Sequence, residues 1–184
     1  MSVALALVVM VEEDWELHLN NGPRVDLVKV KEGDVPILVN KWEVFADRVL
    51  NAISGIFSRY DYAGAAELAS DALRRPLSEE RQNHFQRIYT LARAFEAWDR
   101  FDYEEAYKLL EPFAKDFVEH KIALERILGR SEKISGYEKV GDLIRNAERR
   151  AVQCRYDGAV ARLYRALELF AQLRLKQILS RRGI

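Results

Sequence analysis

The sequence is poor in the residues that interrupt helices or build chemical centres. It has four prolines and nine glycines in 184 residues, a scarcity that favours long helices over strands joined by many turns. The single cysteine, Cys154, excludes an internal disulfide and is typical of a protein of the reducing cytoplasm. The three histidines lie far apart, and neither a Gly-rich phosphate loop nor a Cys/His metal pattern occurs. We therefore expect no metal and no cofactor.

The N-terminal apolar run lacks the features of a signal peptide. No basic residue precedes residues 3–11 (VALALVVMV), and three acidic residues follow them at 12–14. The run is also too short to span a bilayer, so no membrane partner is expected. From its length we predict a buried helix over residues 1–11.

The rest of the first forty residues has a strand pattern. Residues 15–19 alternate in polarity, a turn signal occupies 20–23, and residues 25–31 read as a second strand. A short extended stretch is expected at 35–39. One helix with two or three strands cannot close a core alone, which makes residues 1–40 a small α/β remnant of a larger domain.

From Lys41 onward the apolar residues recur with a helical period, so we expect a mainly α fold, a helical-hairpin bundle. One helix start is well marked, with Ser78 as N-cap before Glu79 and Glu80. The last two helices have the most regular apolar stripes.

A weak repeat runs through this helical part, at residues 59–65 (RYDYAGA), 100–106 (RFDYEEA) and 155–159 (RYDGA). Each copy has an aromatic residue, an Asp that can cap a helix, and an Ala where two helices can approach closely. The intervals are too unequal for a regular tetratricopeptide array. A helical-repeat, tetratricopeptide-like interaction module nevertheless stays as an alternative function. The predicted capping residues are Asp61, Asp102 and Asp157.

Charge is balanced overall but unevenly distributed. Residues 139–184 carry eleven Lys and Arg against four Asp and Glu, a net charge of +7, so the remainder carries −7. A basic C-terminal helix pair beside an acidic body indicates an anionic partner or a contact between the two regions.

Three segments together resemble a known family. They are residues 97–103 (AWDRFDY), 146–150 (NAERR) and 155–168 (RYDGAVARLYRALE), and the third is the most specific. Their order is similar to that of the type III CRISPR-associated proteins with a CARF domain, a helical middle and a HEPN domain. The residues that carry the resemblance, to which we give structural roles, are Trp98, Asp99, Asp102, Asn146, Tyr156, Asp157, Tyr164 and Glu168.

The resemblance implies a Rossmann-like CARF sensor that binds cyclic oligoadenylate and activates HEPN ribonuclease sites formed across a homodimer. It divides this chain into the end of a CARF domain (1–40), a helical middle domain (41–135) and the first HEPN helices (136–184). The ligand-binding turn would then lie before Met1, so cyclic oligoadenylate is expected only for the complete family protein. The chain is accordingly expected to be an incomplete ancillary protein of a type III antiviral defence system.

The chain departs from the family at the catalytic motif. HEPN ribonucleases need an Arg followed five to seven positions later by a His, which together stabilise charge and transfer a proton at the scissile phosphate. None of His18, His84 and His120 has an Arg at that spacing. In the family the motif would fall beyond Ile184, so we expect no enzyme activity from this chain.

Two surfaces of the C-terminal helices are candidates for partners. The apolar residues there exceed what one neighbouring helix can cover, and we expect them to form a homodimer. Ion pairing is the favoured role of Arg162 and Arg165, and contact with RNA phosphates is the alternative. The residues expected to self-associate are Leu167, Phe170, Leu175, Ile178 and Leu179. The weak candidates for binding RNA are Arg149, Arg150, Arg155, Arg162 and Arg165.

Overall fold

The structure is a computed structural model that describes residues 7–11, 14–18, 29–30, 41–132 and 134–182. It divides into two compact units, residues 1–45 and 46–184. The segments predicted as a turn at 20–23 and as an extended stretch at 35–39 lie outside the described residues.

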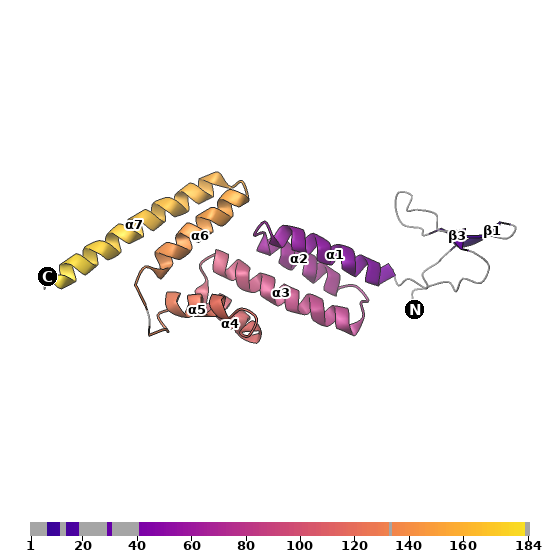
Figure 1. Cartoon of the computed structure of the whole chain (residues 1–184), viewed down its shortest axis with the longest axis horizontal. Helices are drawn as coiled ribbons and strands as arrows, with labels where there is room; N and C mark the ends of the chain where they lie inside the picture. Colours follow the sequence, from indigo (N-terminus) through magenta and orange to yellow (C-terminus); the bar gives the residue numbers. More distant parts are fainter. Residues whose placement is uncertain (1–6, 12–13, 19–28, 31–40, 133, 183–184) are drawn as a thin grey trace. The chain divides into compact units, whose positions relative to one another are not determined.

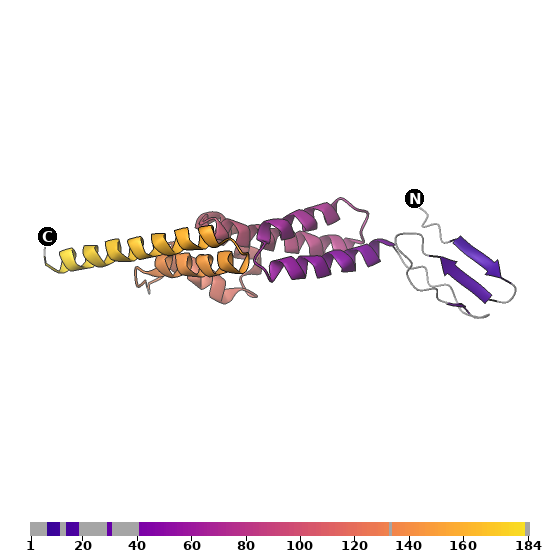
Figure 2. The ribbon, with the colours of Figure 1, turned by 90° about the horizontal axis from the view of Figure 1, so that it is seen from above.

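Three strands are described in the first unit. They are β1 (Leu7–Val11), β2 (Asp14–His18) and β3 (Lys29–Val30). The three strands pair antiparallel in the order β1-β2-β3, and Figure 2 shows the two longer ones as antiparallel arrows. The structure therefore has a strand over Leu7–Val11, where we predicted part of a helix. The run contains three valines, and β-branched side chains favour extended backbone. A short apolar run without periodicity does not separate the two structures by itself.

The rest of the described chain is helical, which confirms the mainly α prediction (Figures 1 and 2). Its elements are α1 (Lys41–Phe57), α2 (Tyr62–Leu73), α3 (Glu79–Asp99), α4 (Tyr103–Leu110), the short 3₁₀ helix η1 (Glu111–Phe113), α5 (Val118–Ile127), α6 (Glu138–Val152) and α7 (Tyr156–Arg181).

Three helix–helix turns share one backbone conformation. A residue with positive φ lies directly before the N-cap in each: Tyr60 (φ 61°), Phe101 (φ 66°) and Cys154 (φ 59°). The N-cap residues are Asp61, Asp102 and Arg155, and only the two aspartates cap through their side chains. A buried alanine lies four residues after each N-cap: Ala65, Ala106 and Ala159.

The turns explain the weak sequence repeat and correct one detail of it. Asp157 is not the cap of the last helix, because it is the second residue of α7 and lies two positions after the N-cap Arg155. Aligning the third copy by its aromatic residue shifted it by two positions relative to the backbone, which pairs Tyr60 with Cys154 and Asp61 with Arg155. The small alanines fit the repeat because a methyl group lets two helix backbones approach closely.

Two clusters form part of the core described for the second unit. The larger one surrounds Ala97, Trp98, Leu110 and Leu124 on α3, α4 and α5. The smaller one holds α6 and α7 together, and its buried members are Val140, Leu143 and Ala166, with Phe101, Tyr137, Leu169 and Leu173 packed against them. Helix α7 thus turns an Ala- and Leu-lined side toward α6 and leaves most of its bulky apolar residues exposed.

Candidate functional site: the Asp99 network and the apolar face of α7

Asp99, the last residue of α3, is the centre of a buried polar network. Its Oδ1 accepts from Asn146 Nδ2 at 2.8 Å and from Arg149 Nε at 3.0 Å, while its Oδ2 accepts from Arg150 Nη2 at 2.5 Å. Asn146 also donates to the Asp99 carbonyl oxygen at 2.9 Å. The three partners lie at helical spacing on α6 and so reach Asp99 from one face. We call these four residues the Asp99 network.

Burial makes this contact more than a surface ion pair. The side chains of Asp99, Arg149 and Arg150 are only 9%, 18% and 15% exposed, and Asn146 is fully buried. A carboxylate with three charge-assisted or amide donors in such a site is held in one geometry. The end of α3 is thereby tied to the middle of α6 by side chains.

A second carboxylate, Asp142, lies one turn earlier on the same face of α6. Its Oδ1 accepts from Trp98 Nε1 at 3.0 Å, and its Oδ2 accepts from the Tyr103 hydroxyl at 3.1 Å. Burial is the main cause that raises the pKa of Asp142, against the lowering effect of these donors and of Arg149. Burial and the nearby Asp142 raise the pKa of Tyr103 as well, so its hydroxyl remains a donor.

Polar contacts also connect the end of α6 to the turn between α1 and α2. Gln153 Nε2 donates to the Tyr60 carbonyl oxygen at 2.8 Å, and Arg150 Nη1 donates to Gln153 Oε1 at 3.2 Å. Burial, the largest effect, raises the pKa of Tyr62 in the same region to about 12. Two of the three repeated turns therefore meet α6 through polar side chains.

The outer side of α7 is apolar and exposed. Tyr164 is 73% exposed, Leu167 67%, Val160 65% and Leu175 57%. Helices α6 and α7 lie side by side as an antiparallel pair, so α6 covers one side of α7 (Figures 1 and 2). We call the other side the apolar face of α7. Its residues are Val160, Leu163, Tyr164, Leu167, Phe170, Leu175, Ile178 and Leu179.

The structure distributes the predicted site residues among different surroundings. It brings Trp98, Asp99 and Asn146 together with Arg149 and Arg150 in one place. The apolar face of α7 contains all five residues predicted to self-associate, Leu167, Phe170, Leu175, Ile178 and Leu179. The ring centroid of Phe170 also lies 5.5 Å from that of Tyr137.

Other predicted residues lie apart from the Asp99 network. Arg165 pairs with Glu168 at 2.7 Å along α7, as expected for a pair three residues apart. Arg155 is exposed at the N-cap of α7, beside the exposed Tyr156 and Asp157.

Sequence reasoning did not predict the polar contacts of Asp142, Tyr103, Gln153 and Tyr60. A signal for Asp142 was present, since it precedes Asn146 by four residues and Arg149 by seven. These polar residues lie at helical spacing beside the buried Val140, Leu143 and Ala147. Polar residues that share the buried side of a helix indicate hydrogen-bonded partners on another element.

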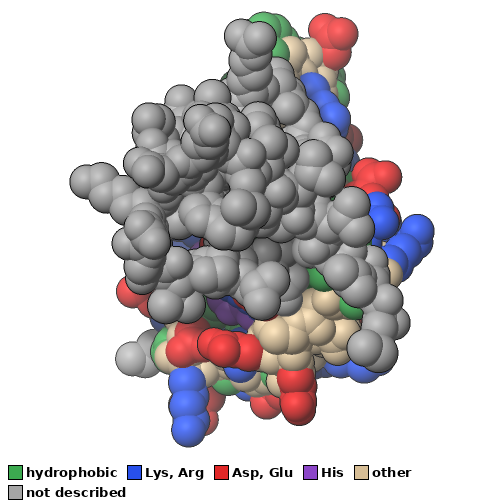
Figure 3. All heavy atoms as spheres, turned by 90° about the vertical axis from the view of Figure 1, so that its right-hand side faces the viewer, with side chains coloured by type: hydrophobic (Ala, Val, Ile, Leu, Met, Phe, Trp, Pro, Cys, Tyr) green, Lys and Arg blue, Asp and Glu red, His purple; other side chains and the backbone are tan. Residues whose placement is uncertain are grey.

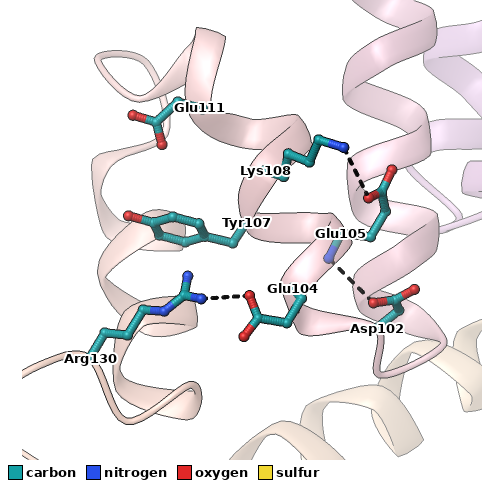
Figure 4. Close-up of a pocket in the computed structure, with 7 residues that line it drawn as sticks. All are labelled: Asp102, Glu104, Glu105, Tyr107, Lys108, Glu111 and Arg130. Carbon is teal, nitrogen blue, oxygen red and sulfur yellow. Dashed lines mark hydrogen bonds and ion pairs between the residues drawn. The ribbon is translucent and has the colours of Figure 1, made fainter.

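The acidic residues of α4 line an open pocket whose charges are largely engaged (Figure 4). Arg130 Nη2 lies 2.6 Å from Glu104 Oε2, and its guanidinium stacks 4.9 Å from the Tyr107 ring centroid. Asp102 caps α4 by accepting from the Glu105 backbone N–H at 3.3 Å. Helix capping and ion pairing account for this pocket without a ligand.

The remaining polar groups do not form a second chemical centre in the part of the chain that the structure describes. His120 packs its ring against Phe95, Trp98 and Phe117, as a structural histidine does. No group of three potential metal ligands occurs among the described residues, and none of the helices described is long and apolar enough to cross a membrane. On the face drawn in Figure 3, acidic and basic side chains are interspersed.

Two protein-family models match the sequence of these helices. The model of the Csm6 6H domain matches residues 45–135, and the model of the Csm6 HEPN domain matches residues 129–182. Both describe type III CRISPR-associated ancillary proteins, the class predicted from the three sequence segments. The chain belongs to the Csm6-like family within that class. No curated protein and no solved structure matches the chain.

The residues of the Asp99 network are divided between the two matched regions. Asp99 and Trp98 lie in the 6H match, whereas Asn146, Arg149 and Arg150 lie in the HEPN match. The buried carboxylate therefore joins the two matched regions.

Proposed function

We propose that this chain is the helical middle and the first HEPN helices of a ribonuclease that responds to cyclic oligoadenylate. The observation that carries the proposal is the order of the two matches, a 6H region followed directly by a HEPN region over residues 45–182. Residues 1–40 are, in this proposal, the end of the CARF sensor. The Asp99 network supports it, because a hydrogen-bonded contact of fixed geometry between two regions can carry coupling from one to the other.

The 184-residue chain alone is inactive in this proposal. It has no Arg five to seven positions before any of its three histidines, so it lacks the charge and the proton donor that the reaction uses. Incubation of the purified chain with labelled single-stranded RNA, with and without cyclic tetra- or hexa-adenylate, should give no cleavage. Metal-independent cleavage that persists through repurification would contradict the proposal.

The sensing function belongs, in the same proposal, to the complete family protein. Calorimetric titration of the chain with cyclic tetra- or hexa-adenylate should be flat at micromolar concentrations. A clear isotherm would place a ligand site within these 184 residues and overturn this part of the proposal. The cleavage assay and the titration can fail separately, so they distinguish a misplaced sensor from a misplaced nuclease.

We also propose that the chain self-associates through the apolar face of α7. Eight bulky apolar residues on one side of a helix are more than isolated exposed residues, and such patches mark interaction sites. A second copy presents the same face, and an isologous pair of long helices buries both at once. RNA binding by the basic C-terminal pair is the alternative if the chain is monomeric.

A further inference from the structure

Arg162 on α7 is a half-buried cation without a carboxylate partner. Its Nη1 donates to the Gly158 carbonyl oxygen at 3.1 Å, and its Cζ lies 5.8 Å from the centroid of the Phe101 ring. Its Nε is enclosed and has no hydrogen-bond partner. Among the described residues no acidic side chain forms an ion pair with it, whereas Arg165 on the same helix pairs with Glu168 at 2.7 Å.

The neighbours of Arg162 add positive charge. Arg150 and Arg149 of α6 act on it as like charges, and both share the single carboxylate of Asp99. Burial first, and then the charge of Arg150, lower the pKa of Arg162, and these effects outweigh the opposite effect of the Asp99 carboxylate. Arg150 Nε is likewise enclosed without a partner. Asp142, whose charge acts on Arg149, is the other acid of this cluster, and its carboxylate accepts from Trp98 and Tyr103.

The resulting surplus is one or two positive charges, depending on whether Asp142 is ionised. Uncompensated charge in a half-buried site is costly, and an anion that enters the site relieves the cost. The cations are also held in place before any ligand arrives, Arg162 by Gly158 and Phe101 and Arg150 by Asp99 and Gln153. Such preorganisation lowers the entropy lost on binding.

We propose that Arg162, assisted by Arg150, is the core of a binding site for an oxyanion of the phosphate class. Guanidinium groups match the oxygen geometry of phosphate through paired N–H donors, and phosphate carries one or two negative charges, which equals the surplus. The proposal is independent of the proposed function, because it rests on charges within the chain. The source of the phosphate is either a free small anion or the backbone of a nucleic acid.

The test compares the whole chain with two variants of one helix. Arg162→Gln removes the unpaired cation, and Arg165→Gln removes the exposed, paired one three residues away. Calorimetric titration with inorganic phosphate at constant ionic strength should give saturable binding by the wild type and by Arg165→Gln. Arg162→Gln should bind at least about tenfold more weakly, since a hydrogen bond to a charged group is worth that much.

A second arm identifies the source of the anion. A 2′-O-methyl hexanucleotide, which offers phosphodiesters, is titrated into the same three proteins. Dependence on Arg162 in both arms assigns the site to a nucleic-acid backbone, and dependence in the phosphate arm alone assigns it to a small anion. Arg162→Lys, which keeps the charge but loses the planar fork, serves if Arg162→Gln does not fold and should bind more weakly than wild type. Absence of saturable binding in both arms, or equal loss in both Gln variants, overturns the proposal.

Discussion

The two sides of the α6–α7 pair reverse the usual distribution of residue types. On α6, Asn146 and Asp142 are buried, and most of their polar atoms are paired with residues of α3 and α4. On α7, Leu167 and Tyr164 are among the most exposed large apolar residues of the described chain. Burial in this protein follows the presence of a partner and not polarity alone. An apolar stripe shows that a face needs to be covered, but not which molecule covers it.

The largest expected effect comes from removing the carboxylate of the Asp99 network. Asp99→Asn leaves Arg149 and Arg150 without their shared acid and should destabilise the fold by roughly 3 kcal/mol, the lower end of the range for a broken buried pair. We choose the lower end because both arginines keep some exposure, 18% and 15%. Urea denaturation measures the free energy of unfolding.

Asp102→Asn is the matched control for this prediction. Asp102 lies three residues further on and caps α4, a role that Asn performs about as well. Its unfolding free energy should stay within about 0.5 kcal/mol of wild type. Equal losses in the two variants would mean that the Asp99 network adds no stability beyond that of an ordinary surface carboxylate.

The apolar face of α7 gives the next largest effect, on association instead of folding. The double variant Leu167→Glu, Leu175→Glu places charges where two exposed leucines would meet a second copy. The dimer should weaken about 100-fold or more, because each buried Leu contributes on the order of 1.5–3 kcal/mol. Light scattering over a concentration series measures this.

Val118→Glu controls for the general effect of adding charge to an exposed apolar position. Val118 on α5 is 51% exposed and lies outside the α7 face. It should leave association unchanged. A wild-type chain that is monomeric at every concentration would rule out self-association and leave RNA as the first partner to test, by salt-dependent binding.

Replacing Asp142 should have a smaller effect on the free energy of unfolding, and this effect should depend on pH. Its pKa is raised above 3.8 in the fold, so the folded chain keeps a proton that the unfolded chain has lost. The stability of the wild type relative to Asp142→Asn, which does not titrate, should therefore fall as pH rises from about 3.8 through the raised folded pKa. Urea denaturation between pH 3.5 and about 6.5 measures the difference.

Glu138 provides a comparison of opposite sign on the same helix. Burial acts to raise its pKa, but hydrogen bonds, including that from the Ser135 backbone N–H, outweigh burial and lower it. The stability of the wild type relative to Glu138→Gln should accordingly rise with pH, through the lowered folded pKa and up to the ordinary value of 4.5. A difference for Asp142→Asn that also rises with pH would contradict the raised pKa of Asp142.

The sequence was most informative where spacing alone decides the structure. Helical periodicity predicted the helices from Lys41 onward, and three short segments predicted the family. Periodicity could not decide between helix and strand for Leu7–Val11, because a short apolar run suits both. It also could not find the bonds from Asp142 to Trp98 and Tyr103, since such bonds depend on how α6 packs against residues some forty positions away. Which face of α7 is buried depends in the same way on the partners that α7 meets.

The smallest effect concerns the turn that joins α6 to α7. Cys154 is exposed with φ 59°, a conformation that costs an ordinary residue about 1–2 kcal/mol and costs glycine little. Cys154→Gly should stabilise the chain by roughly 0.5–1 kcal/mol, because the greater freedom of glycine in the unfolded state cancels part of the gain. Phe101→Gly makes the same backbone change at an equivalent turn, but it removes a ring that contacts Tyr103 and Arg162 and should destabilise. Urea denaturation of both variants measures the two signs. If Cys154→Gly also destabilises, the interactions of the Cys154 side chain contribute more than the backbone strain costs.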